Sequence, residues 1–352
     1  MIASDDLRAA VESGLLTEAQ AVSLRALADS RRGAREGLAP GDEPFELFKG
    51  FNEIFIVVGL VILAAGWITV NSVTMATEIV NYQSHILTAT VIGGLVIWGI
   101  SEYFIRIRRM VAPAIALSIM FAGNAVAGCA AYFAEPFMVA QEDFSSLPIA
   151  MGASVAALTV YWWRFRVPFA MALIALGIFG LAMIIGANSA GTPADITDIF
   201  RLSAQGPFAW ITLAVGLAVF VVAMVFDMSD PHRVTRRSAQ GFWLHVVAAP
   251  ALVNTLALAL MESESNAVLL VVLLAFALIA IIIDRRSFLI TAIGYVVALA
   301  FTVFEGDGAG LTILFLGIFL VALGAFWARI RAALLKTFSG VLPLKRLPPA
   351  HS

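Results

Sequence analysis

The sequence predicts an all-α fold: a polytopic membrane protein with ten transmembrane helices and a small N-terminal cytoplasmic helical hairpin. Two observations lead to this prediction. Ten strongly apolar stretches, each about the length that crosses a bilayer, follow one another after Asn52. The Lys and Arg residues between these stretches fall almost entirely on alternate loops, which is the pattern of a chain that crosses a membrane repeatedly.

The composition excludes a water-soluble domain. Of 352 residues, 61% are hydrophobic and 13% are charged, and the mean hydropathy is +0.94. A soluble domain carries roughly a quarter of charged residues. The net charge of −2 gives no indication of a nucleic-acid partner. The single cysteine, Cys129, excludes an intrachain disulfide and a metal site built on several cysteines.

Four segments follow from the residue pattern. Residues 1–33 predict a cytoplasmic helical hairpin, because Gly14 ends one amphipathic stretch and Thr17 with Gln20 forms a capping-box pattern before the next. Residues 34–51 are rich in turn-forming and charged residues and then in aromatics, as in a linker followed by an interfacial segment. The predicted domains are 1–33, 34–51, a transmembrane domain at 52–329, and a cytoplasmic tail at 330–352.

The ten apolar stretches predict helices because backbone polar groups must bond internally in lipid. The fourth and eighth are short for a span, and each leads into a tight basic turn, so each forms a transmembrane hairpin with its successor. The predicted spans are 52–72, 84–105, 111–133, 147–163, 167–188, 207–227, 240–261, 266–283, 287–304 and 309–329.

Basic residues set the orientation. The N-terminal segment, the even-numbered loops and the tail hold nearly all of them, whereas the odd-numbered loops hold only Arg201. Lys and Arg near span ends stay on the cytoplasmic side, so we predict a bacterial inner-membrane protein with both termini in the cytoplasm. The outer loops are acidic, which fits either a mouth that concentrates cations or loops that merely need solubilising charge.

Three polar residues lie deep in the predicted spans and are the candidate substrate-binding residues: Asn124, His245 and Asn254. Asn124 fits either a polar path or an interhelical hydrogen bond, because small residues surround it. Asn254 follows Pro250 by one turn, which fits either a kinked substrate site or an ordinary packed helix. His245 fits either a group that titrates near neutrality or a buried packing residue.

No catalytic or cofactor signature accompanies these residues. The sequence contains no phosphate-binding loop, no His-Glu-x-x-His metal motif and no Gly-x-Ser-x-Gly elbow, and its four histidines are scattered. We therefore predict no catalytic residues, no metal and no cofactor, and a protein that is not an enzyme.

Three features resemble a class of uncharacterised bacterial multi-span membrane proteins, the domain of unknown function 2157 class. They are the N-terminal run GLLTEAQ at 14–20, the hairpins that turn on Arg, and the tail from Trp327 to the prolines at 348–349. The resemblance implies a membrane location and carries no activity or site residues.

Two functions fit these observations. The first is a binding, sensing or scaffold protein in the lipid bilayer whose residues 1–33 contact a cytoplasmic protein partner. The alternative is a secondary carrier for a small solute that uses Asn124, His245 and Asn254. Neither involves a nucleic acid, and a homo-oligomer fits both.

Overall fold

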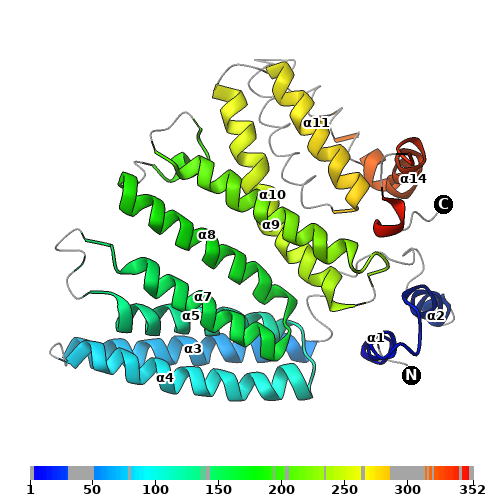
Figure 1. Ribbon diagram of the computed structural model, residues 1–352. Coiled ribbons are helices and arrows are strands. Elements are labelled where there is room, and N and C mark those ends of the chain that lie inside the picture. The colour runs from blue at the N-terminus through cyan, green and yellow to red at the C-terminus, as the bar shows by residue number, and fades with distance from the viewer. Residues whose placement is uncertain are drawn as a thin grey trace. The chain divides into compact units, whose positions relative to one another are not determined.

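Every element in the part of the chain that the structure describes is a helix (Figure 1). The structure is a computed structural model. It describes residues 4–30, 51–77, 81–135, 138, 143–192, 195–202, 206–233, 235–262, 266–285, 314, 317–318, 321–340 and 343–348. The chain divides into two compact units. The α3–α8 unit comprises Phe45–Ala194 and Gly206–Ile211, and the α9–α14 unit comprises the remaining residues.

Two short helices, α1 (Ser4–Glu12) and α2 (Glu18–Ser30), begin the chain. Gly14 takes a left-handed conformation after α1, with φ of 74°. The capping box before α2 is formed: the Thr17 N–H donates to Gln20 Oε1 at 3.0 Å, and the Gln20 N–H donates to Thr17 Oγ1 at 3.3 Å. Buried Leu7 and Ala21 join the two helices.

The α3–α8 unit is a set of apolar helices arranged around α5. Helix α5 packs against α3, α4 and α7, and α7 packs against α8 (Figure 1). A π-helical turn at Glu102–Ile107 continues α4. The helices are α3 (Phe51–Thr77), α4 (Tyr82–Ser101), α5 (Ala112–Phe133), α7 (Leu147–Phe165) and α8 (Pro168–Ala190).

Aromatic rings fill the centre of this unit. Tyr161 is fully buried and stacks on Phe121 at a centroid distance of 4.4 Å, and Trp98 meets the Phe165 ring edge-on at 5.0 Å. The Tyr161 hydroxyl lies 2.8 Å from Ser101 Oγ and so has a hydrogen-bond partner. Buried aromatic pairs of this kind stabilise a helix bundle beyond their area alone.

In the described part of the α9–α14 unit, α1 and α2 are followed along the chain by three apolar helices and one short basic helix. They are α9 (Phe208–Met228), α10 (Arg236–Glu262), α11 (Asn266–Ile283) and α14 (Trp327–Thr337). Helix α11 packs against α10 and α14. Helix α9 approaches α10 closely at Gly216, where an added Cβ would lie 2.8 Å from the Ala251 side chain.

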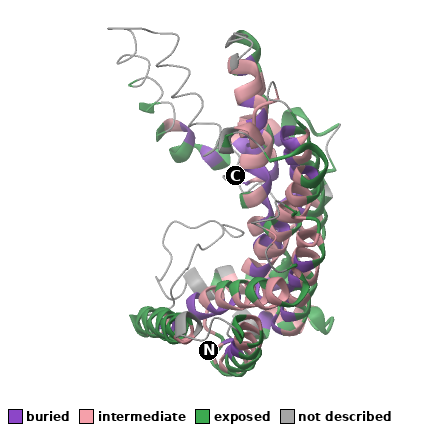
Figure 2. Cartoon of the chain, turned by 90° about the vertical axis from the view of Figure 1, so that its left-hand side faces the viewer, coloured by how far each residue is buried: buried purple, intermediate pink, exposed green. Residues whose placement is uncertain are grey.

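Eight of these helices begin within four residues of the first eight predicted spans. Six are long and apolar enough to cross a membrane: α3, α4 with its π-turn, α5, α8, α9 and α10. Only 11% of the most apolar window of α3 is buried, and exposed or intermediate residues line the helices (Figure 2), as expected for surfaces that face lipid. The helices are consistent with a protein embedded in a membrane.

The predicted span 287–304 lies outside the described residues, as does much of 309–329. The C-terminal boundary of the tenth span also differs from the prediction. The helix breaks at Phe326, with φ of −107°, and α14 starts at Trp327, inside the predicted tenth span. The break turns the Trp327 indole toward the end of α11, where Nε1 donates to Asp284 Oδ1 at 2.8 Å.

Among the described residues, four turns between helices use a residue in the left-handed region that is not glycine. The φ angles are 52° at Arg109, 53° at Arg166, 54° at Arg233 and 58° at Asp284. Each residue follows the helix that the sequence predicts to end on the basic side. The left-handed conformation costs a residue with a side chain roughly 1–2 kcal/mol. These turns therefore contain charged residues at positions where glycine would be less strained.

Candidate functional site

Asp227 lies near the end of α9 and is buried between helices. It contacts α10 at Gly241, where an added Cβ would overlap Asp227 Oδ1 and lie 3.3 Å from the Ala223 carbonyl oxygen. Only glycine at 241 therefore leaves room for this carboxylate. A buried carboxylate is costly unless it is paired and hydrogen-bonded.

Arg285 supplies the pairing charge. It follows directly after α11 and is 1% exposed. Its Nε donates to Asp227 Oδ2 at 2.9 Å and its Nη2 donates to Asp227 Oδ1, so the two side chains meet fork to fork. Nη2 also donates to the Ser238 carbonyl oxygen at 3.0 Å. The cation lies at a helix C-terminus, where the helix dipole stabilises it.

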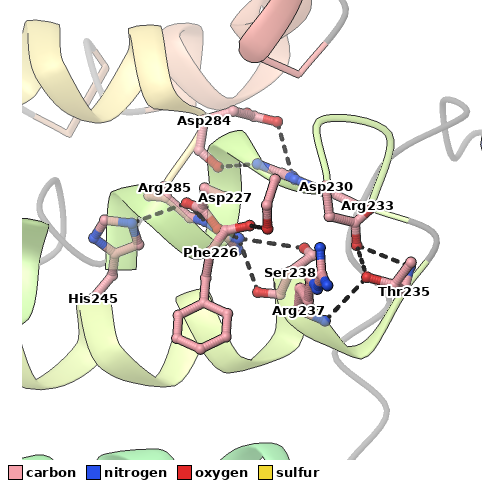
Figure 3. A network of polar contacts seen from close by, with 11 residues as sticks. Phe226, Asp227, Asp230, Arg233, Thr235, Arg237, Ser238, His245, Asp284 and Arg285 are labelled. Atoms are coloured by element: carbon pink, nitrogen blue, oxygen red, sulfur yellow. Dashed lines mark hydrogen bonds and ion pairs between the residues drawn. The ribbon is translucent and has the colours of Figure 1, made fainter. Parts of the chain in front are cut away.

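His245 completes this group from the interior of α10. Its side chain is fully buried, and Nε2 lies 2.9 Å from Asp227 Oδ2 (Figure 3). Because an ionised carboxylate only accepts hydrogen bonds, Nε2 carries the proton. The Phe220 ring lies edge-on to the imidazole at 5.5 Å. Gly241 and His245 are four residues apart and lie on one face of the helix.

Asp284 is the centre of a second group beside the first. Its Oδ2 lies 3.0 Å from Arg233 Nη1, and its backbone oxygen accepts from Arg233 Nη2 at 2.8 Å (Figure 3). Its Oδ1 accepts from Trp327 Nε1. Asp284 and Arg285 are consecutive, so the two groups are joined covalently. With a neutral His245, the two carboxylates and two guanidiniums balance.

The loop between α9 and α10 is closed by its own contacts. Asp230 is 1% exposed, and its Oδ2 accepts from the Thr235 N–H at 2.8 Å and from Thr235 Oγ1 at 2.7 Å (Figure 3). The Arg233 N–H donates to the Asp230 carbonyl oxygen at 3.0 Å. These bonds hold Arg233 where it meets Asp284.

Arg331 connects α14 to the tail. Its Nη2 donates to the Pro348 carbonyl oxygen and lies 3.5 Å from the Ile282 carbonyl oxygen at the end of α11. Burial lowers the pKa of the Arg331 guanidinium; the Asp284 carboxylate opposes this shift and Arg233 adds to it. The Arg331 side chain thus links the tail at Pro348 to the end of α11 at Ile282.

This arrangement can hold α9, α10 and the end of α11 in register, because His245 and Arg285 both bond the Asp227 carboxylate. In the part of the chain that the structure describes, no three His, Cys, Asp or Glu residues are grouped so as to hold a metal ion.

The three residues predicted from the sequence have different surroundings. Asn124, in α5 of the α3–α8 unit, donates through Nδ2 to the Thr90 carbonyl oxygen of α4 at 2.8 Å. Its side chain fills the space above Gly93, where an added Cβ would lie 2.8 Å from Asn124 Oδ1. This contact is an interhelical hydrogen bond, one of the two interpretations that the sequence left open.

His245 and Asn254 both lie in α10 of the α9–α14 unit. Nine residues of α-helix correspond to about 13 Å of rise and two and a half turns, so the two side chains point to opposite faces. His245 meets Asp227 and Arg285, and Asn254 is partly buried one turn beyond Pro250.

Sequence reasoning missed Asp227, Arg285 and Ser238 as partners of His245. Two signals could have found them. Asp227 stands inside the apolar boundary of its span, and His245 stands one turn inside the next, so both lie at the same depth on adjoining helices. The short loop between those helices makes them antiparallel neighbours.

Comparisons with known proteins give no relative. No family model matches the chain, and neither a curated protein nor a solved structure is similar to it.

Proposed function

We propose that the chain is a membrane-embedded binding or sensing protein of the bacterial inner membrane, with both termini in the cytoplasm. In this proposal, contacts made at the cytoplasmic surface reach the membrane helices through the ends of α9, α10 and α11. The concentration of Lys and Arg on alternate loops supports this orientation.

The observation that carries the proposal is a path of side-chain contacts with one covalent step between consecutive residues. It runs from His245 in α10 to Asp227 in α9, then to Arg285 and its neighbour Asp284, and ends at Trp327 in α14. Ionisable residues inside apolar helices are rare and mark function more often than structure. This path ends at the inner face of α14, a helix whose outer residues Arg329, Ala333 and Lys336 are exposed.

The test is whether a change at Trp327, at one end of the path, alters the helices around Asp227 and His245. Trp327→Phe removes the indole N–H donor to Asp284 and keeps an aromatic ring in the cluster with Ile281 and Leu323. Amide hydrogen exchange in lipid nanodiscs should rise at the end of α9 and the start of α10. Trp163→Phe is the matched control, because Trp163 is 66% exposed in the other unit. Unchanged exchange in Trp327→Phe would overturn the proposal.

The structure of α1 and α2 supports the second element of the proposal, that residues 1–33 bind a cytoplasmic protein partner. Among the residues of these helices whose burial is described, two are buried in their shared core, Leu7 and Ala21. A helical pair this small rarely folds stably without a further contact. Leu15, between the helices, is 79% exposed, whereas its neighbour Leu16 packs against the small core.

Leu15→Gln and Leu16→Gln form a matched pair for this second element. A photocrosslinker at Ser13 of the full-length protein in cells should give an adduct of defined mass. Leu15→Gln should abolish it without loss of helicity, and Leu16→Gln should lower helicity as well. Removal of residues 1–44 should abolish the partner and leave membrane insertion intact. A crosslink to this chain's own membrane helices would exclude a separate partner.

A secondary carrier for a small solute is the second candidate. The observation that favours it is the position of His245 and Asp227 inside apolar helices, as in proton-linked transport paths. Asn124→Leu and Asn254→Leu should then abolish solute flux in proteoliposomes without loss of folded protein, while removal of residues 1–44 should leave flux intact. Flux that survives both Asn substitutions would argue against this assignment.

Membership of the domain of unknown function 2157 class and a homo-oligomeric state are further proposals. The resemblance of the N-terminal run and the tail supports the first. Cross-linking of the purified protein across a concentration series tests the second.

A further inference from the structure

Helix α14 presents two different faces. Its inner face carries Trp327, Arg331 and Leu335, which are buried. Its outer face carries Arg329, Ala333 and Lys336, which are exposed and spaced three and four residues apart. Phe326, immediately before the helix, is 49% exposed and lies beneath the Arg329 guanidinium at 5.7 Å from the ring centroid.

The charge of this face has one sign. From 308 to the end of the chain the sequence has no Asp or Glu, and its basic residues include Arg329, Lys336 and Arg346. Phe338 and Leu344, which follow the helix, are 37% and 41% exposed. Exposed basic residues beside exposed aromatic and aliphatic ones are the composition of a helix that lies in the headgroup layer of a membrane.

The position of α14 agrees with this composition. Trp327 is bonded to Asp284, which lies one residue beyond the last residue of α11. The cluster of Ile281, Leu323 and Trp327 packs α14 against the same end of α11. Figure 1 shows α14 beside the end of α11 in this unit. Because α11 is an apolar helix, its end marks the depth at which hydrocarbon gives way to headgroups.

We propose that the outer face of α14, formed by Phe326, Arg329, Ala333 and Lys336, binds the headgroups of anionic phospholipids. The occupant follows from charge complementarity: a phosphate-bearing anionic surface meets a face that carries only positive charge. Arg329 and Lys336 contact the phosphates, and Phe326 lies at the acyl boundary. The proposal rests on the proposed function in one respect, that this end of α11 faces the cytoplasmic leaflet.

The headgroup contact also provides a way for the membrane lipid to act on the path from Trp327 to His245. Lipid binding on the outer face of α14 orders the helix, and its inner face holds Asp284 through Trp327. The contact of Asp284 with Arg233, and the adjoining pair of Arg285 with Asp227, then depend on the lipid composition. The proposed lipid-binding face is thus linked to the buried ion pairs through α14 and the hydrogen bond from Trp327 to Asp284.

The test uses the full-length protein in nanodiscs with a fluorescent label on Ala333→Cys, in a Cys129→Ala background. The probes are phosphatidylglycerol and phosphatidylcholine, each brominated near its headgroup end and present at equal mole fraction. Phosphatidylglycerol should quench the label about three times more strongly. The preference should shrink at high salt, because exposed charge is screened. Each basic residue near an anionic surface contributes about fivefold in affinity.

Arg329→Gln with Lys336→Gln should bring the quenching ratio to one. Arg106→Gln with Arg108→Gln is the matched control, because these exposed arginines belong to the α3–α8 unit, and it should leave the ratio unchanged. If labelling at 333 disturbs folding, exposed Thr337→Cys serves as the second site.

Equal quenching by the two lipids would overturn the proposal, as would no quenching by either, which would place the face in water or under a protein. The Trp327→Phe exchange experiment separates this failure from failure of the proposed function. If the lipids quench equally but Trp327→Phe still raises hydrogen exchange, only the lipid-binding proposal is rejected. A retained preference with no Trp327 effect rejects the path to the ion pairs.

Discussion

The two units satisfy their buried polar groups in different ways. Among the described residues of the α3–α8 unit, the buried contacts between helices are neutral or involve backbone: Ser101 with the Tyr161 hydroxyl, Asn124 with the Thr90 carbonyl oxygen, and the Glu53 carboxylate with the Ala112 N–H. An ion pair between helices in this unit, Arg164 with Glu102, is partly exposed. In the α9–α14 unit the buried contacts are ion pairs between side chains, centred on Asp227 and Asp284.

This difference indicates in which unit the register of the helices is fixed more strongly. A neutral interhelical hydrogen bond contributes about 0.6 kcal/mol on average in a membrane protein, so a small shift of one helix costs little. A buried carboxylate that loses its guanidinium costs several kcal/mol. The α9–α14 unit is therefore the part whose helix register is fixed by charge, and the α3–α8 unit is fixed by packing of rings and small residues.

Arg285→Leu should break this comparison most strongly. It leaves Asp227 buried without its guanidinium, and the free energy of unfolding should fall by about 3–5 kcal/mol. Denaturant unfolding in detergent, followed by tryptophan fluorescence, measures the loss. The double variant Asp227→Leu with Arg285→Leu removes both charges and should recover most of it. A double variant as unstable as Arg285→Leu alone would show that the pair does not act as a unit.

Gly241→Ala against Gly59→Ala gives the next largest effect. An added methyl group at 241 would overlap Asp227 Oδ1 and crowd the Ala223 backbone, so overpacking should cost about 1–3 kcal/mol. An added methyl group at 59 in α3 meets nothing within 4 Å. There the higher helix propensity of Ala should stabilise by about 0.5–1 kcal/mol. Two substitutions of the same kind should therefore have opposite signs in the same unfolding assay.

The helices themselves could be predicted from sequence because apolar length is a local property. Helix α11 occupies the predicted residues 266–283 without a shift, and α8 begins one residue after the predicted 167. The fourth and eighth predicted spans, short by sequence, correspond to α7 and α11, which fall outside the six helices long and apolar enough to cross.

The partners within the site could not be predicted in the same way. His245 was recognisable as deep and polar, but its pairing with Arg285 links residues 40 positions apart through a carboxylate on a third helix. Nothing local in the sequence encodes which side of an apolar helix faces its neighbour when the helix is hydrophobic all round. The need for glycine at 241 could likewise not be predicted, because it depends on the Asp227 carboxylate of the neighbouring helix.

Glu53→Leu tests the one carboxylate that is buried among the described residues of the α3–α8 unit. Glu53 is 4% exposed, and its Oε2 accepts from the Ala112 N–H at 3.1 Å, at the start of α5, whose own N-cap residue Val111 has no side-chain acceptor. Loss of an N-cap acceptor costs about 0.5–2 kcal/mol. Glu53→Gln keeps an acceptor oxygen and should cost less. Equal losses would mean that the carboxylate acts through its charge alone.

Arg166→Gly should have the smallest effect, because two contributions oppose each other. Glycine relieves the left-handed conformation, a gain of roughly 1 kcal/mol. The substitution also removes the Arg166 guanidinium from the Trp162 ring, 4.9 Å from its centroid, a loss of about 0.5–1 kcal/mol. Arg166→Ala keeps the strain and loses the contact, so it should be the less stable of the two by about 1 kcal/mol.

The same substitution in the other unit sharpens the contrast. Arg233 has nearly the same φ angle, 54° against 53°, but its guanidinium meets the Asp284 carboxylate and backbone oxygen. Hydrogen bonds to charged groups contribute about 1.5–3 kcal/mol, more than the relief of strain returns. Arg233→Gly should therefore destabilise where Arg166→Gly does not. If both were neutral, the ion pair of Asp284 would not stabilise its turn, and the distinction between the two units would rest on Asp227 alone.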